Sequence, residues 1–145
     1  RHFYPQADVP VGQLSLDITK PASWHWAVAQ KLRPLRDEGV LIMGSGNIIH
    51  NLRLMDRWHM DRSVAYDWAM DFRARINRAI LANDLDTLLN FTELGEGARL
   101  AVPVPAEHFL PLLYVLAQRE DGEPVDIFND EIIAGSLSMT SVKVG

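Results

Sequence analysis

The sequence predicts an α/β fold, with a mostly parallel central sheet flanked by helices and antiparallel strands near the carboxyl end. Three observations predict it. A helical pattern in residues 22–39 leads directly into a short apolar run, VLIM at 40–43, and then into a glycine-rich turn. A strand, a helix and a second strand in this order normally form a right-handed parallel crossover. Further helical patterns follow, and two β-like stretches close the chain.

The first half of the chain carries the crossover pattern. Residues 9–16 are β-like, and the helix after them has one apolar face. That face consists of Trp24, Val28, Leu32 and Leu35. Pro34 should bend the helix or begin a second short one, and Gly39 should end it. The run at 40–43 is apolar throughout, which is typical of a strand buried on both faces.

The middle of the chain contains the clearest helical pattern, at residues 63–82. Its apolar residues fall on one face, and Ser63 is a plausible N-cap. A short leucine-rich helix should follow, with Asp84 or Asp86 as its cap. Residues 93–105 (ELGEGARLAVPVP) contain two glycines and two prolines, which predicts a loop.

The last third of the chain begins with FLPLLYVL at residues 109–116, which is apolar all round and predicts a buried helix. Pro111 fits the first turn of such a helix, which places His108 at or just before its amino end. Residues 125–128 and 136–144 are β-like, and they predict the antiparallel strands at the carboxyl end.

Composition excludes several classes of function. A chain of 145 residues fits one domain, and 48% hydrophobic with 23% charged residues excludes wholesale disorder. The net charge of −5 argues against a broad nucleic-acid interface, and no apolar run is long enough to span a membrane. The absence of cysteine excludes thiolate metal sites and cysteine nucleophiles. No signal peptide is visible, so we expect a cytoplasmic location, and Arg1 in first place suggests a piece of a longer chain.

His50 and His108 are the candidate catalytic or metal-binding residues. His50 follows the glycine turn at the end of the 40–43 run, where ligand sites of open α/β sheets are found. His108 precedes a helix, whose dipole disfavours the imidazolium and keeps the ring in the neutral form that a metal needs. Two histidines far apart in sequence are a weak signal, and a solvated or capping role for His108 is the plain alternative.

The remaining polar candidates have structural readings that we prefer. His2 is uninformative, His25 is expected on the surface or in packing, and His59 lies in a charged loop. Glu107 could assist a metal, but an acid at a helix start is ordinary. The other candidates near His50 are Asn51 and Arg53, which could contact a substrate but are expected to be ordinary loop residues.

Two catalytic motifs are absent from the glycine turn. The segment GSGNIIH does not have the spacing of a serine-hydrolase nucleophile elbow, so a hydrolase that uses His50 as a base has no visible nucleophile. The third glycine of a dinucleotide-binding fingerprint is also missing. The turn therefore favours neither of these chemistries.

Several separated motifs, in order, resemble one enzyme family. GVLIMGSGNIIHNLR, PVPAEHFLPLLYVL and SLSMTSVKVG are similar to the carboxyl-terminal half of class III extradiol ring-cleavage dioxygenases, in particular the 4,5-DOPA dioxygenase extradiol-like branch. The opening YPQADVPVGQLSLD follows the same branch. The resemblance covers essentially residues 1–145, which it identifies as the carboxyl-terminal portion of a single catalytic domain whose amino-terminal half is absent.

The resemblance implies chemistry at a non-haem Fe(II) centre, although Zn(II) can occupy such a site. The metal binds a catechol, such as DOPA, through both hydroxyls and takes dioxygen at an open position, and the ring is cut beside the hydroxyls. Four histidines line the pocket in this branch, and two of them match His50 and His108. The resemblance makes His108 the metal ligand and leaves His50 as either a ligand or an acid/base.

The resemblance also implies a partner. The other two histidines belong to the amino-terminal half, so the isolated chain is expected to be inactive because Fe(II) normally needs three protein ligands. The alternative function is a non-enzymatic binding or scaffold module of the same fold.

Overall fold

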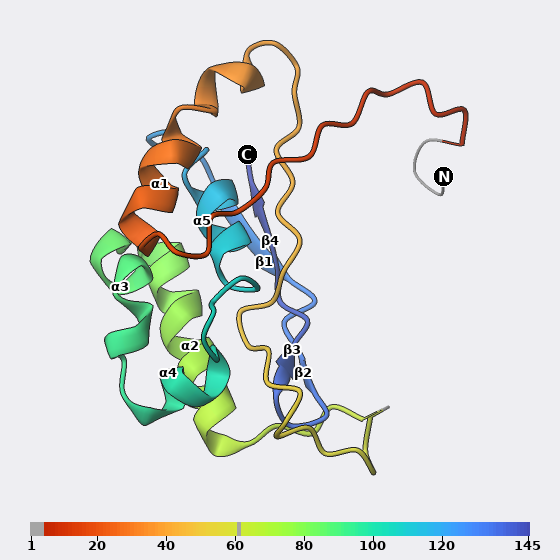
Figure 1. The fold of residues 1–145 in the computed structure, drawn as a ribbon, viewed down its shortest axis with the longest axis vertical. Coiled ribbons are helices and arrows are strands. Elements are labelled where there is room, and N and C mark those ends of the chain that lie inside the picture. The colour runs from red at the N-terminus through yellow and green to blue at the C-terminus, as the bar shows by residue number, and fades with distance from the viewer. Residues whose placement is uncertain (1–4, 61) are drawn as a thin grey trace.

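The elements follow one another as helices first and strands last (Figure 1). The structure is a computed structural model that describes residues 5–60 and 62–145. The helices are α1 (Ala22–Gln30), α2 (Asp67–Ala82), α3 (Leu85–Leu89), α4 (Glu96–Ala101) and α5 (Leu110–Leu116), with the 3-10 helices η1 (Arg33–Arg36) and η2 (Phe91–Glu93). The strands are β1 (Val125–Phe128), β2 (Ile132–Ile133), β3 (Leu137–Ser138) and β4 (Ser141–Val144).

The strands form two small antiparallel sheets rather than one parallel sheet. β1 pairs with β4, so that Val125 lies opposite Val144, and β2 pairs with β3. The α/β class and the antiparallel strands at the carboxyl end are confirmed. Within the described residues, however, no parallel sheet forms, because the extended segment at 40–46 has no strand beside it.

The run at 40–43 differs from the expectation of a strand buried on both faces. Leu41 is 73% exposed and Met43 is 80% exposed, whereas Ile42 is half-buried. Residues 9–16 are also extended and mostly exposed, although Leu16 packs against the core. Both segments run as drawn-out chain in Figure 1, and neither pairs with a strand in the described part of the chain.

The core lies between the helices and the sheets. α2 buries the apolar face that the sequence pattern predicts, including Phe72, Ile76 and Ile80. It packs against α3 and α4. Phe109 is fully buried, and its ring stacks on Phe91 with the centroids 4.0 Å apart. α1 packs against α5. This core fixes the amino end of α5, which carries one of the candidate histidines.

The predicted helix boundaries are partly correct. α1 and η1 are separated near Pro34 as expected, and Gly39 follows them with a positive φ of 80°. Asp84 caps α3 by accepting a hydrogen bond from the backbone N–H of Thr87 at 3.1 Å. α2, in contrast, begins at Asp67 rather than Ser63. Residues 63–66 are extended instead, because their backbone bonds to Gly135.

The prediction of a loop throughout residues 93–105 is wrong, because α4 forms within it. Gly95 has a φ of 100° and turns the chain into this helix. Ala98 and Ala101 are buried against α2, and Gly97 allows close packing on the carbonyl of Trp68. Tertiary packing therefore overrides the low helix propensity of a glycine-rich segment.

The elements near the carboxyl end agree with the prediction more closely. α5 begins at Leu110 with Pro111 in its first turn. The predicted strand at 125–128 is β1, and the predicted strand at 136–144 is divided into β3 and β4. In the residues that the structure describes, no helix is both long enough and apolar enough to cross a membrane.

Candidate functional site

The segment that carries His50 is fixed from both sides. On one side, the Asn47 backbone N–H donates to the carbonyl of His108 at 2.8 Å. On the other side, the backbone N–H of Ile49 donates to the Ser138 hydroxyl at 3.2 Å, and the Ser138 N–H donates to the Ile49 carbonyl at 3.1 Å. Ser138 is fully buried. The loop is therefore held between the start of α5 and strand β3.

Gly46 makes the approach to His108 possible. A Cβ at this position would collide with the carbonyl oxygen of His108, and a Cβ at Gly44 would lie 2.6 Å from that of Pro111. Only glycine permits such close backbone contact. The glycine turn thus has a specific structural role, which is to bring the His50 loop against the start of α5.

The end of α4 fixes His50 itself. The His50 backbone N–H donates to the carbonyl of Ala101 at 2.9 Å. The buried side chain of Asn51 donates to the carbonyl of Leu100 at 2.8 Å and accepts from the N–H groups of Arg53 and Leu54. Asn51 therefore organises the backbone of the turn, which is the ordinary loop role expected for it.

The two candidate histidines lie against each other. The ring centroids of His50 and His108 are 3.6 Å apart, and the ring planes are inclined by 24°. His108 directly precedes the first turn of α5, and its side chain is 40% exposed. Glu107 lies nearby, with its carboxylate Oε1 3.9 Å from Nε2 of His108. Residues 58 positions apart in sequence (108 minus 50) are thus brought together by the fold.

Burial lowers the pKa of His50 below its ordinary value of 6.5. The neighbouring His108 lowers the pKa further, because two imidazolium ions at this distance would repel each other, whereas Glu107 acts in the opposite direction. The lowered pKa favours the neutral imidazole of His50. A neutral ring has a free nitrogen lone pair, which can accept a proton or bind a metal ion.

The donor set here fits part of a metal centre. Two imidazoles at contact distance can reach one ion, and nitrogen donors suit Fe(II) and Zn(II) alike. In stacked rings the lone pairs lie in nearly parallel planes, so shared coordination needs a rotamer change of the exposed His108. Within the described residues, no group of three or more His, Cys, Asp or Glu side chains surrounds a common point. A metal centre with three protein ligands at this place would need a donor from outside the described residues.

A pocket of about 420 Å³ opens beside the two histidines. Its volume lies in the range of small-molecule sites. The lining includes the proline-rich segment at 103–105 and the side chains of Arg53 and Arg99. Arg99 escaped sequence reasoning because the predicted loop hid the helix that presents it. Prediction of a helix at residues 96–101 would have pointed to Arg99.

The other histidines have structural surroundings. His25 is fully buried, with Nδ1 3.0 Å from the Tyr114 hydroxyl and Nε2 3.1 Å from the carbonyl of Asp17. His59 is paired with Asp56 at 2.7 Å and is 44% exposed. His2 lies outside the described residues. Of the two roles expected for His25, on the surface or in packing, the structure shows packing.

Comparison with known proteins shows that the chain is similar to extradiol dioxygenases. It is 45% identical over 150 aligned residues, which is 99% of the chain, to 4,5-DOPA dioxygenase extradiol of Escherichia coli K12. It is 35% identical over 96% of its length to the protein of the same name from Portulaca grandiflora. No family model matches the chain.

A solved structure supports the same relationship. The crystal structure of the uncharacterized protein JW3007 from Escherichia coli K12 is similar with a TM-score of 0.87 and 43% identity, over 98% of this chain and 58% of that one. The resemblance to the 4,5-DOPA dioxygenase extradiol-like branch is therefore confirmed. The chain spans about half the length of the curated relatives it matches, 52% and 50% for the two named above, in agreement with the half-length expectation.

Proposed function

We propose that the full-length protein is an extradiol ring-cleavage dioxygenase, and that this chain supplies His50 and His108 to its metal centre. The supporting observation is the contact between the two imidazoles, 3.6 Å between centroids, at the edge of a pocket of suitable size. The names of the relatives add the reaction class and a catechol, DOPA, as the first substrate to test. A mostly parallel central sheet and a cytoplasmic location remain part of the proposal.

In the proposed reaction, the carbon–carbon bond beside the two hydroxyl-bearing carbons breaks, and both atoms of dioxygen enter the product. Non-haem Fe(II), when bound, supplies a Lewis acid that favours deprotonation of the catechol and open positions for catechol and dioxygen. Two imidazoles alone rarely hold Fe(II), so the other half of the protein must supply further ligands. The isolated chain is therefore expected to be inactive.

The two histidines have different proposed roles. His108 is the proposed ligand, because the resemblance to the dioxygenase branch makes it one and its side chain is 40% exposed beside the pocket. His50 is either a second ligand or the base that takes a catechol proton at a ring nitrogen. The lowered pKa of His50 keeps the ring neutral, which both roles require.

The test uses the full-length protein reconstituted with Fe(II) without oxygen and then mixed with a panel of catechols that includes DOPA. We expect oxygen uptake and a yellow ring-opened product. The absence of uptake with every catechol by iron-loaded protein would overturn the enzyme proposal and favour a scaffold role.

Two variants of the full-length protein separate the roles. His108→Ala should lose iron, and His50→Ala should lose turnover. If His50→Ala retains iron, His50 is the acid/base; if it loses iron, His50 is a ligand. Full activity in either variant would contradict the assignment of that residue.

A further inference from the structure

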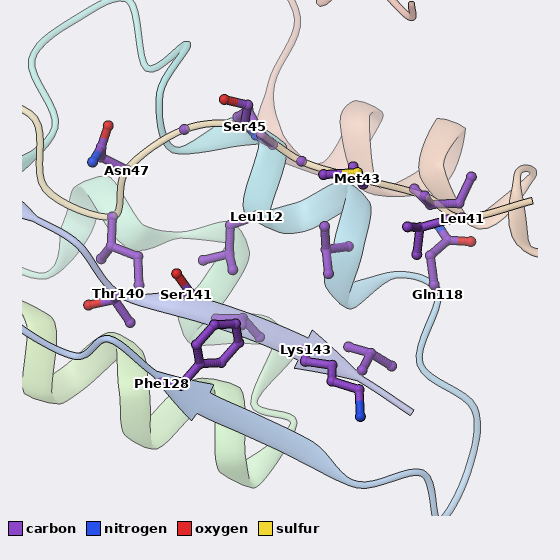
Figure 2. A pocket seen from close by; sticks show the side chains of 18 of the residues that line it. Leu41, Met43, Ser45, Asn47, Leu112, Gln118, Phe128, Thr140, Ser141 and Lys143 are labelled. Atoms are coloured by element: carbon purple, nitrogen blue, oxygen red, sulfur yellow. The ribbon is translucent and has the colours of Figure 1, made fainter. Parts of the chain in front are cut away.

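The pocket of about 420 Å³ is the cavity in which a substrate is expected, because both His50 and His108 line it. We name it the histidine pocket. A larger cavity, of about 680 Å³, lies between the extended segment at 41–46, strand β4 and helix α5 (Figure 2). His108 borders this second cavity, but His50 is not part of its lining. A molecule that contacts both imidazoles therefore occupies the histidine pocket.

The histidine pocket combines an apolar wall with two arginines. The apolar wall is the segment VPVPA at 102–106. The guanidinium groups belong to Arg53, in the turn after His50, and to Arg99, on α4. An apolar surface suits the face of an aromatic ring, whereas a guanidinium binds a carboxylate through two parallel hydrogen bonds. The lining therefore suits a molecule that is aromatic at one end and anionic at the other.

The turn and the helix that carry the two arginines are held together by Asn51. Its side-chain amide N–H donates to the carbonyl of Leu100, the neighbour of Arg99, at 2.8 Å. Its side-chain oxygen accepts a hydrogen bond from the backbone N–H of Arg53 at 3.1 Å. Since Asn51 directly follows His50, the backbone at both arginines is fixed relative to that imidazole.

The fold does not use either guanidinium group. In residues 5–60 and 62–145, no ion pair or side-chain hydrogen bond engages Arg53 or Arg99, and both residues are exposed. Arg36, in contrast, is paired with Glu123. An arginine without a carboxylate partner is available to bind an anion from solution.

The charge of the histidine pocket also favours an anion. Among the described residues of its lining, the one acidic side chain is Glu107, whose carboxylate lies 3.9 Å from His108. Two guanidinium groups thus stand against one carboxylate, in a chain whose net charge is −5. A pocket with an excess of positive charge raises the local concentration of anionic ligands.

We propose that Arg53 and Arg99 bind the carboxylate of the substrate, so that the protein selects catechols with an acidic side chain. This inference rests on the proposed function, because it takes the histidine pair as the place where the catechol hydroxyls react. The segment at 102–106 covers the ring, and the guanidinium groups hold the far end of the molecule. Arg99 contributes more than Arg53, because it lies on a helix anchored by the buried Ala98 and Ala101.

Catechols of different charge should therefore bind with different affinity. Dihydrocaffeate carries a carboxylate on a two-carbon side chain, 4-ethylcatechol has a neutral side chain of similar shape, and dopamine carries an ammonium group. Guanidinium groups attract the first compound and repel the third. DOPA has both a carboxylate and an ammonium group, so its affinity should lie between those of dihydrocaffeate and dopamine.

The test is calorimetric titration of these catechols into the full-length, Fe(II)-loaded protein without oxygen, so that binding is measured and no turnover occurs. We expect dihydrocaffeate to bind about 100-fold more tightly than 4-ethylcatechol. Arg99→Gln should reduce this preference about 10-fold, and the double variant with Arg53→Gln should abolish it. The affinity for 4-ethylcatechol should not change in either variant.

Arg78→Gln is the matched control, because Arg78 is an exposed arginine on α2 that does not line the histidine pocket. This variant should keep the full preference for dihydrocaffeate. A preference that Arg78→Gln retains and the double variant lacks supports the proposal.

Two outcomes would overturn this inference alone. One is equal affinity of the parent protein for dihydrocaffeate and 4-ethylcatechol. The other is an equal loss of affinity for both compounds in Arg99→Gln, since that result indicates a structural role. Failure of the iron-loaded protein to bind any of the catechols would instead contradict the proposed function, and this inference with it.

Discussion

At the scale of single residues, the contact between His50 and His108 depends on a glycine. Gly46 allows the loop to lie on the His108 carbonyl, and the hydrogen bond from Asn47 to that carbonyl follows from this approach. The glycine turn and the helix start were both visible in the sequence. The tight backbone contact that joins them was not, because it links residues that are far apart in the chain.

Gly46→Ala should therefore destabilise the protein and weaken iron binding. The new Cβ has no room beside the His108 carbonyl, and overpacking of this kind costs about 1–3 kcal/mol. Urea unfolding and iron titration of the full-length protein measure the two effects. Gly12→Ala is the matched control, because nothing lies within 4 Å of a Cβ there. Equal stability of the two variants would contradict the account of Gly46.

The pKa of the Glu123 carboxyl is strongly lowered in the folded protein, so we expect its contribution to stability to depend on acidic pH. Hydrogen bonds from Arg36 lower its pKa from the ordinary 4.5 to about 2, and the backbone N–H of Glu120 adds to the effect. A lowered carboxyl pKa in the folded state means that the unfolded state binds more protons. The contribution of Glu123 to stability is therefore present above pH 4.5 and is lost as the pH falls towards about 2.

Glu123→Gln should remove this part of the pH dependence. The variant is expected to be less stable than the parent protein at pH 6, and the difference should shrink as the pH falls from 4.5 towards about 2. Thermal unfolding across this range provides the measurement. A difference that is constant with pH would show that the charge of Glu123 has no role.

At the scale of elements, local patterns predicted helices well and strand pairing poorly. The apolar period identified the buried face of α2, and Asp84 was correctly proposed as a cap. α4 was missed because its stability comes from packing on α2 rather than from its glycine-containing sequence. The start of α2 was predicted too early, because Gly135, some 70 residues away, holds residues 63–66 extended.

The exposed face of the segment at 41–46 leads to a prediction about the stability of two variants. The same change, methionine to glutamine, is made at Met43 and at Met70. In the chain as described, Met43 is 80% exposed and Met70, on α2, is 42% exposed. Exposure alone predicts that Met70→Gln costs more. If the other half of the protein covers the segment, Met43→Gln should cost more in the full-length protein, by about 1–2 kcal/mol. Urea unfolding of both variants measures which substitution lowers the free energy of unfolding more.

At the scale of the whole molecule, the chain spans about half the length of the curated relatives it matches. It has a helical core of its own, yet within the described residues the segment at 41–46 has no neighbouring strand, and the proposed metal centre has two imidazoles as donors. The α/β class was predictable from motifs, and the motifs also singled out the two histidines that the fold brings into contact. A parallel sheet was not formed, because a sheet needs neighbours that residues 5–60 and 62–145 do not supply.

The buried His25 illustrates the same limit of sequence reasoning. Its contact with the Tyr114 hydroxyl joins α1 to α5 across 89 residues. The sequence shows a histidine between two tryptophans on a helix, and nothing local reveals which side chain will meet it. Contacts between side chains that are far apart in the sequence depend on how the helices pack, which the local sequence does not reveal.

The most direct test of the account is the iron content of the full-length protein and its two histidine variants after anaerobic loading with Fe(II). The account predicts stoichiometric iron in the parent protein and almost none in His108→Ala. His25→Gln serves as the control, because His25 lies in the core and should leave iron binding intact. Full iron occupancy in both His50→Ala and His108→Ala would contradict the claim that this chain contributes to the metal centre.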